Sequence, residues 1–276
     1  MAAITADLDP VLIIRLHKGD TPDPRCAELA DFLYGYFMTP AAPGIRYGRY
    51  QNSCSIIVLS ETFDDYYSGA AGYATRRKVR KAEKLGYTFA PIEHDDFIDD
   101  IYKINTSLDE RQGRPMDEGY RVRPKPIRAG AASTCPRHRE VWYGVVHDGH
   151  LVAYTWVYMV GEMCLFNRIL GHGEHMANGV MYQLVVGAIA DLTATAGLRY
   201  AMYERHTSGT EGLRFFKERM GFRPYWVDWQ LGDEAVISTR PFFQQGASRP
   251  GARPSLMRRV ARRVRREVRR LANRSA

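Results

Sequence analysis

The stretch EVWYGVVHDGHLVAYTWVYMVGEMCLFNRILG, residues 140–171, decides how the rest of the sequence is interpreted. It contains three runs rich in β-branched and aromatic residues, which span residues 140–149, 150–161 and 162–171. The Asp148-Gly149 and Gly161-Glu162 junctions between these runs have the chemistry of tight turns. The stretch therefore predicts three consecutive antiparallel strands, a β-meander.

Helices and strands alternate on both sides of this meander. Before it, short apolar runs predict strands at 11–16 and 54–59, with a helix at 27–37 between them. A basic helix over 74–85 ending at Gly86, a strand at 87–93, a helix at 95–111 and a Gly/Pro-rich loop at 112–126 follow. After the meander we expect a helix at 180–197, a strand at 198–205, a helix at 209–221 and a strand at 222–232.

The length and composition are those of a chain that folds by itself. Its 276 residues include 45% hydrophobic residues, enough for a substantial core. No apolar run approaches the roughly 20 residues that span a bilayer, and the first residues lack a signal-peptide pattern. We expect the protein in the cytoplasm, with a peripheral position on the inner face of the membrane as the second placement.

The cysteines and histidines do not predict a metal site. Four cysteines lie far apart in the sequence and form no CxxC pair, so neither a zinc site nor a disulfide framework is indicated. His172 and His175 lie close together, but we expect no third ligand near them. The sequence predicts no metal.

The positive charge is concentrated at the C-terminal end of the chain. The formal net charge is +8, yet residues 241–276 alone contain eleven arginines and one acidic residue. Residues 241–255 have the composition of a linker, and residues 256–276 predict an arginine-rich amphipathic helix with one apolar stripe. Such a helix binds an anionic membrane surface, and its arginines also suit RNA phosphates. Stripe and charge together favour the membrane.

The element order from residue 87 to residue 232 resembles the GNAT acyltransferase fold. Three segments resemble Fem-type aminoacyl transferases and other FemAB-like proteins: TRRKVRKAEKLGY, ANGVMYQLVVGAIADLTATAG and GLRFFKERMGF. The resemblance implies an α/β (α+β) fold, with a mixed, mostly antiparallel central sheet flanked by helices. It implies a GNAT-like catalytic domain at 76–240, preceded at 1–75 by a small α/β region that is a truncated GNAT-like half.

The resemblance also draws attention to the start of the helix after the meander. Many GNAT enzymes bind the CoA pyrophosphate there, through an (R/Q)xxGx(G/A) turn whose backbone N–H groups face the phosphates. This sequence has Gly171, Gly173 and Gly179 in that region, but not at that spacing. Asn178 and Gly179 still offer an anion site at the helix N-terminus. These four residues are candidates for donor binding, and the three glycines serve equally well as turn residues.

By the same resemblance, the reacting groups meet in a gap between the strands that flank the helix at 180–197. Strand alternation predicts that Glu204 and His206 face one side, with Tyr203 on the other. Glu204 is the candidate general base, and His206 is the candidate to share or relay its proton. Tyr203 completes the catalytic set. The competing interpretation pairs Glu204 with Arg205 or another basic residue at the strand end.

Five further residues are candidates for binding the substrate. Asn167 and Arg168 are polar in an otherwise apolar strand and need a partner or a ligand, and an arginine there can clamp a carboxylate or phosphate. Arg111 and Arg114 belong to the loop that shapes the acceptor site in GNAT folds. The resemblance places Lys217 against a phosphate or carboxylate of the substrate, whereas helix periodicity alone makes it a surface lysine.

We therefore expect a GNAT/FemAB-like N-acyltransferase that moves an acyl group from acyl-CoA to an amine acceptor by direct attack. An aminoacyl-tRNA donor is the alternative, and the product is then an amide of an amino acid. A non-catalytic RNA- or membrane-binding module stays open as well, because the CoA turn is missing. The expected partners are an amine-bearing acceptor, tRNA, and an anionic membrane surface contacted by residues 256–276.

Overall fold

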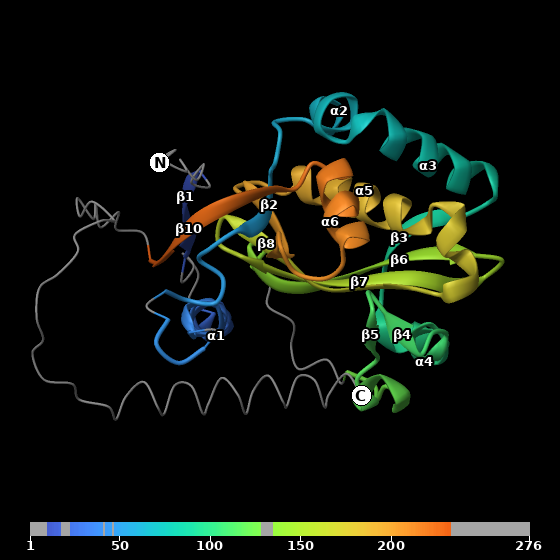
Figure 1. The fold of residues 1–276 in the computed structure, drawn as a ribbon, viewed down its shortest axis with the longest axis horizontal. Coiled ribbons are helices and arrows are strands. Elements are labelled where there is room, and N and C mark those ends of the chain that lie inside the picture. The colour runs from blue at the N-terminus through green and yellow to red at the C-terminus, as the bar shows by residue number, and fades with distance from the viewer. Residues whose placement is uncertain (1–9, 18–22, 41, 46, 128–134, 233–276) are drawn as a thin grey trace, which may run out of the picture.

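The computed structural model describes residues 10–17, 23–40, 42–45, 47–127 and 135–232 (Figure 1). The predicted linker at 241–255 and the predicted arginine-rich helix at 256–276 lie outside the described residues. So do residues 1–9 of the predicted N-terminal region and residues 233–240 of the predicted catalytic domain.

One large sheet organises the molecule. Its eight strands run in the order β1-β10-β2-β9-β8-β7-β6-β3. The pairs β1–β10 and β8–β9 are parallel, and the other neighbours are antiparallel. This confirms the predicted mixed, mostly antiparallel fold class. The strands are β1 (Val11–Leu16), β2 (Cys54–Val58), β3 (Thr88–Ile92), β6 (His138–His147), β7 (His150–Val160), β8 (Met163–Gly171), β9 (Tyr200–Arg205) and β10 (Arg223–Leu231).

The meander forms as its turn chemistry predicts. Asp148 and Gly149 both have positive φ, 49° and 79°, as a two-residue hairpin turn that follows the strand twist requires. Gly161 has φ 57°, and a Cβ there would lie 2.3 Å from the carbonyl oxygen of Arg15. The second turn therefore packs directly against the end of β1.

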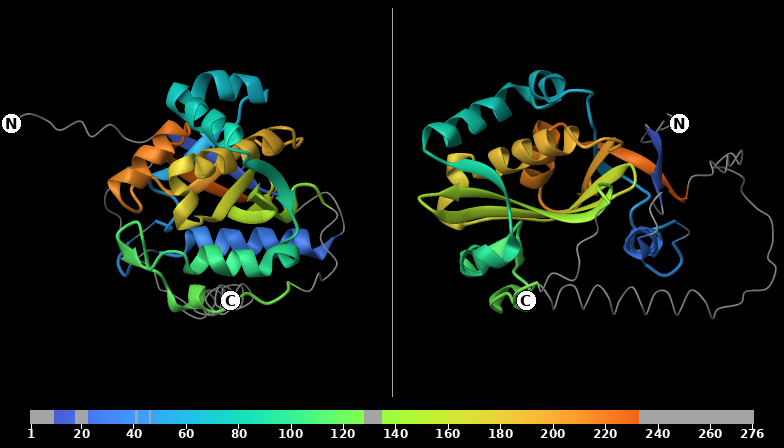
Figure 2. Two further views of the ribbon diagram at one scale, coloured as in Figure 1. Left: turned by 90° about the vertical axis from the view of Figure 1, so that its right-hand side faces the viewer. Right: turned by 180° about the vertical axis from the view of Figure 1, so that it is seen from behind.

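Helices cover both faces of the sheet (Figure 2). On one face, α5 (Val180–Thr193) packs on the meander, with α3 (Gly72–Lys84) and α6 (Glu211–Arg219) on the same side of the sheet. On the other face lie α1 (Pro24–Met38) and α4 (Ile98–Thr106). The buried apolar residues accordingly form two clusters, one on each face. None of the helices in the described ranges has the length and apolar character that crossing a membrane requires.

Shorter elements complete the structure. A second, two-stranded sheet pairs β4 (Glu110–Arg111) with β5 (Arg114–Pro115). The remaining short helices are α2 (Phe63–Asp65), η1 (Tyr66–Ala70), η2 (His94–Phe97), η3 (Glu118–Arg121) and η4 (Gly173–Asn178).

The N-terminal segment contributes to the main sheet. β2 lies between β9 and β10, and β1 pairs in parallel with β10 along its whole length, from Val11–Trp226 to Leu16–Leu231. The strands predicted for the small N-terminal α/β region therefore extend the sheet of the predicted catalytic domain. They bury apolar side chains such as Ile14 and Ile56 in the same core cluster as β7.

The helix predicted over 95–111 is shorter than expected. It begins as η2, continues as α4 and ends at Thr106. The hydroxyls of Thr106 and Ser107 donate hydrogen bonds to carbonyl oxygens of the last helical turn. The Arg111 guanidinium donates to Ile104 O at 2.7 Å. These side chains satisfy the carbonyl groups that the backbone N–H groups of a further helical turn would otherwise bond. The helix therefore ends, and the chain turns into the β4–β5 hairpin.

Candidate functional site at the gap between β8 and β9

Strands β8 and β9 lie side by side for only part of their length. Their parallel pairing runs from Met163–Tyr200 to Leu165–Met202 and then stops. Beyond that point β8 keeps only β7 as a partner and β9 keeps only β2. The strands therefore separate in front of Tyr203, at the place where the sequence predicted a gap.

Both strands are irregular at this point. Asn167 is the extra residue of a bulge in β8, because Trp156 pairs with Arg168 and the next residue, Val157, pairs with Phe166. In β9, Glu204 has a φ of 52°, which is rare for a residue with a side chain. Such irregularities change the direction of neighbouring side chains and often occur at functional sites.

Lys217 of α6 is fully buried, with 0% of its surface exposed. Its Nζ donates to Arg205 O at 2.7 Å and to Ser208 Oγ at 3.0 Å, and it lies 4.8 Å from the centre of the Tyr203 ring. Burial lowers the pKa of Lys217 to about 8, although Glu204 opposes the shift. The interpretation of Lys217 as a surface lysine is therefore wrong.

Glu204 joins this group through Ser208. The Ser208 hydroxyl lies 2.9 Å from Glu204 Oε2 and 2.7 Å from Arg205 O, and either oxygen can accept its one hydrogen. Glu204, Ser208 and Lys217 thus form a chain of polar contacts beside the Tyr203 ring. Glu204 has a positive φ that makes the strand irregular here, and its charge acts on Tyr203 and Lys217. The carboxylate is paired with a hydroxyl rather than with Arg205.

Tyr203 is buried, with 8% exposure. Burial raises its pKa, the charge of Glu204 raises it further, and a hydrogen bond from the side chain of Gln112 lowers it. The phenol therefore keeps its proton at physiological pH. Gln112 belongs to the tight turn between β4 and β5, so the loop predicted to shape the acceptor site does reach the gap.

His206 contacts different partners. Its Nδ1 lies 3.2 Å from Ser55 Oγ, and its Nε2 lies 3.5 Å from Glu218 Oε1. The buried ring lines a hollow of about 760 Å³ between the start of α6 and the end of β9, together with Arg214 and Phe215. The relay between His206 and Glu204 stays a prediction.

Arg168 lies on the opposite face of the sheet, among phenol rings. Its guanidinium carbon is 4.8 Å from the centre of the Tyr120 ring. Burial alone would lower the pKa of Arg168, but Tyr154 and Tyr120 outweigh it, so the pKa is raised and the charge is retained. Within the described part of the chain, no carboxylate lies within ion-pair distance of Arg168. A partly buried guanidinium among phenols is suited to an anionic ligand.

The other three substrate-binding candidates differ in their surroundings. Arg111 donates to Gly171 O at 2.8 Å, to Ile104 O and to Ser107 Oγ, so its terminal nitrogens are used within the protein. Arg114 is exposed at the tip of the β4–β5 hairpin, and Asn167 is exposed at its bulge. Of these five candidates, Lys217 and Arg168 are the cations that the structure brings to the gap, Lys217 fully buried and Arg168 partly buried.

The similarity of this chain to known proteins lies in its fold. No family model matches the sequence, and no curated protein matches it either. Among solved structures, FemX superposes with a TM-score of 0.50 at 10% identity, covering 73% of this chain and 66% of FemX. The fold is GNAT-like, of the Fem type.

Two other matches are weaker and partial. L-PGS from Bacillus licheniformis has a TM-score of 0.42 at 16% identity, covering 63% of this chain and 58% of that one. A GCN5-related N-acetyltransferase from Kribbella flavida has a TM-score of 0.33 at 14% identity, covering 50% and 47%. The chain thus spans between about half and two thirds of the length of these structures.

In this GNAT-like fold, the start of α5 is closely packed. A Cβ at Gly179, which has φ 92°, would lie 2.4 Å from Lys78 O, and one at Gly171 would lie 2.5 Å from Met181 Sδ. A Cβ at Gly173 would lie 2.9 Å from Leu108 Cδ2, and the Asn178 amide donates to the Tyr87 hydroxyl at 2.9 Å. Packing against neighbouring elements thus accounts for all four residues that the sequence nominated for donor binding.

A histidine pair beside α5 has a third donor that the sequence interpretation missed. Donor atoms of His172, Glu174 and His175 lie within 4.8 Å of one another. The Tyr87 hydroxyl is 2.8 Å from His175 Nδ1, and burial, with smaller contributions from His172 and His147, lowers the pKa of His175. The expectation that no third ligand lies nearby is therefore wrong, and the His175 ring is already held by Tyr87.

Some site residues had no assigned role in the sequence interpretation. Ser208 lies in the loop between β9 and α6 and connects Lys217 to Glu204. Tyr154 and Tyr158 come from β7, where the period-2 pattern Tyr-Thr-Trp-Val-Tyr puts three aromatic rings on one face. That pattern was visible in the sequence and could have identified the aromatic surroundings of Arg168.

Proposed function

We propose that this protein is an acyltransferase that forms an amide at the gap between β8 and β9. The observation that carries the proposal is the chain Glu204–Ser208–Lys217 beside the buried Tyr203, at the point where the two strands separate. A carboxylate and a protonated phenol at one opening supply the base and the acid that acyl transfer to an amine requires.

The reaction proceeds by direct attack. The amine nitrogen of the acceptor attacks the carbonyl carbon of the donor, and Glu204 accepts the proton that this nitrogen loses. When the tetrahedral intermediate collapses, the bond to the leaving sulfur or oxygen breaks, and the Tyr203 hydroxyl supplies a proton to that atom. Ser208 and Lys217 hold the Glu204 carboxylate in place, so Lys217 is a positioning residue.

Arg168 binds an anionic group of one substrate in this proposal. The guanidinium is partly buried, keeps its charge and has N–H donors along the edges of its plane that match a carboxylate or phosphate. Tyr120 stacks on it and Tyr154 lies beside it, which restricts its orientation. A fixed cation on the α4 face and a base on the α6 face can align one substrate across the gap.

Acyl-CoA is the first candidate donor, and the GNAT-like fold supports it. A specific observation favours aminoacyl-tRNA as the second. The α5 N-terminus, where the pyrophosphate of CoA would bind, is packed against Lys78, and Lys81 donates to Ala177 O at 3.1 Å. The α3 helix that covers it has an exposed basic face suited to RNA phosphates, formed by Arg77, Arg80, Lys81 and Lys84.

Donor binding tests the proposal first. Thermal shift with acetyl-CoA, longer acyl-CoAs and charged tRNA measures which donor stabilises the protein, since a ligand that binds only the folded state raises its melting temperature. Transfer of the labelled acyl group to a panel of amines then measures activity. We expect one donor class to give both a shift and transfer.

A matched pair of variants separates catalysis from binding. Glu204→Gln should keep the thermal shift and lose transfer, whereas Glu211→Gln makes the same change at the exposed start of α6 and should keep both. Wild-type transfer by Glu204→Gln would contradict the proposed base. Binding of nucleic acid or vesicles without any donor binding or transfer would favour the non-catalytic module.

A further inference from the structure

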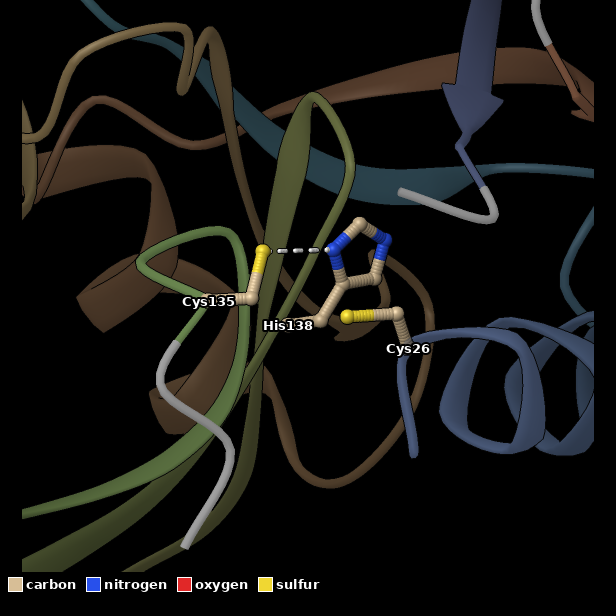
Figure 3. A group of neighbouring side chains, drawn as sticks. All are labelled: Cys26, Cys135 and His138. Carbon is tan, nitrogen blue, oxygen red and sulfur yellow. Dashed lines mark hydrogen bonds between the residues drawn. The ribbon is translucent and has the colours of Figure 1, made fainter. Parts of the chain in front are cut away.

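Three buried metal-binding side chains meet where α1 approaches the start of β6. Cys26 lies in the first turn of α1, Cys135 precedes β6, and His138 is the first residue of that strand (Figure 3). Their exposures are 0%, 5% and 1%. Each pair of donor atoms lies within 4.8 Å, and both cysteines are thiols.

The spacing fits a tetrahedral ion. Zinc binds cysteine sulfur at about 2.3 Å and histidine nitrogen at about 2.0–2.1 Å, so ligand atoms around it lie roughly 3.5 Å apart. Cys135 Sγ and His138 Nδ1 are already 3.3 Å apart. A small movement of the Cys26 side chain therefore completes a Cys₂His set.

The histidine is held in the form that a metal needs. His138 Nε2 contacts the carbonyl oxygen of His17, which can only accept a hydrogen bond, so Nε2 carries the ring proton. The lone pair is then on Nδ1, which faces Cys135 Sγ. A ligating histidine that donates its other N–H to a backbone carbonyl is the common arrangement at metal sites.

Charge favours a divalent cation here. Burial makes an uncompensated charge costly. Two thiolates have a total charge of −2 and a neutral imidazole has none, so together they balance a 2+ ion. Cys26 is the third residue of the 15-residue helix α1. Thiolate ligands select zinc over the hard cations magnesium and calcium.

We propose that Cys26, Cys135 and His138 bind one zinc ion, with a fourth, non-protein ligand such as water. The ion joins the start of α1 to the start of β6 and so fixes the N-terminal segment to the meander. On binding, each cysteine releases its thiol proton to solvent, and no oxidant or reductant is involved. The site is separate from Glu204 and Arg168 and does not depend on the proposed activity.

Elemental analysis of the full-length protein, purified under reducing conditions, tests the proposal. We expect one zinc per chain, a lower melting temperature after removal by a chelator, and recovery when zinc alone is added back. Protein without zinc that gains no stability from added zinc would overturn the proposal, as would a Cys26–Cys135 disulfide in its place.

Cobalt substitution identifies the ligands. Cobalt(II) at this site should show thiolate-to-metal charge-transfer bands, whereas cobalt held by His172, Glu174 and His175 has no thiolate ligand and shows none. Cys135→Ser should weaken these bands and lower zinc affinity at least tenfold, and Cys164→Ser, a change at another buried thiol, should leave both unchanged. If Cys135→Ser fails to fold, the wild-type cobalt spectrum still decides, because absent thiolate bands contradict the site.

Discussion

Lys217 and Arg168 are both cations beside the gap between β8 and β9, but Lys217 is fully buried and Arg168 partly buried, and their surroundings are opposite. Lys217, on the α6 face, donates hydrogen bonds to Arg205 O and Ser208 Oγ, and burial lowers its pKa to about 8. Arg168, on the α4 face, lies among phenols, and their influence outweighs burial so that its pKa is raised. Burial of a cation therefore does not by itself indicate a ligand-binding site. The supply of partners within the protein distinguishes a positioning residue from a binding residue.

Glu204 should show the largest effect, since the α6 face is assigned the chemistry. We expect Glu204→Gln to lower kcat by about 10²–10⁴-fold, the usual contribution of a general base. KM should change little because Arg168 remains. Steady-state kinetics with the donor found by thermal shift measures this split, and a rise in KM at constant kcat would move Glu204 to the binding side of the comparison.

Arg168 should show the second largest effect. Losing a hydrogen-bonded charged contact costs about 1.5–3 kcal/mol, so Arg168→Met should raise KM by roughly 10- to 100-fold while kcat falls less. Arg168→Lys keeps the charge but loses the planar fork, and should recover only part of the affinity. If both variants keep the wild-type KM, the α4 face does not bind the substrate.

Arg111 is the structural counterpart to Arg168. Its guanidinium satisfies the carbonyls of Ile104 and Gly171, so Arg111→Met should lower the free energy of unfolding by about 1–3 kcal/mol. KM should stay close to the wild-type value. Urea unfolding measures the loss, and the exposed Arg114→Ala serves as the control, with an expected change below about 0.5 kcal/mol.

Lys217 should show an effect that depends on pH. Its pKa is about 8 in the folded protein against the ordinary 10.5. Between these values the unfolded chain holds a proton that the folded chain has lost, so wild-type stability rises with pH through this window. Lys217→Met lacks this rise. Parallel curves of unfolding free energy against pH for the two proteins would contradict a buried, proton-losing lysine.

Much of the fold is local information and could be predicted. The meander follows from alternating apolar runs with turn residues between them, and α3 ends before Gly86 because glycine alone readily adopts its φ of 84°. The place of β1 and β2 in the main sheet could not be predicted, because pairing between residues about 140–215 positions apart leaves no local pattern.

The site could be predicted only in part. The gap, Arg168 and Tyr203 follow from the resemblance and from polar residues in apolar strands. The burial of Lys217 depends on the carbonyl of Arg205 approaching from another element, and helix periodicity contains no such information. The positive φ of Glu204 is a backbone irregularity that strand alternation in the sequence does not indicate. Cys26 and Cys135 meet through tertiary packing alone, although Cys135 and His138 have a metal-ligand spacing in sequence.

A crystal structure with a non-reactive analogue of the bound donor tests most directly whether the acyl carbonyl reacts between β8 and β9. We expect the carbonyl carbon in front of Tyr203. The Glu204 carboxylate should lie within hydrogen-bond reach of the position of the attacking amine nitrogen, about 3 Å or one water away. A donor whose carbonyl lies instead in the hollow beside His206, or in the groove lined by Phe63, Phe89 and Gln183 beside α5, would contradict it.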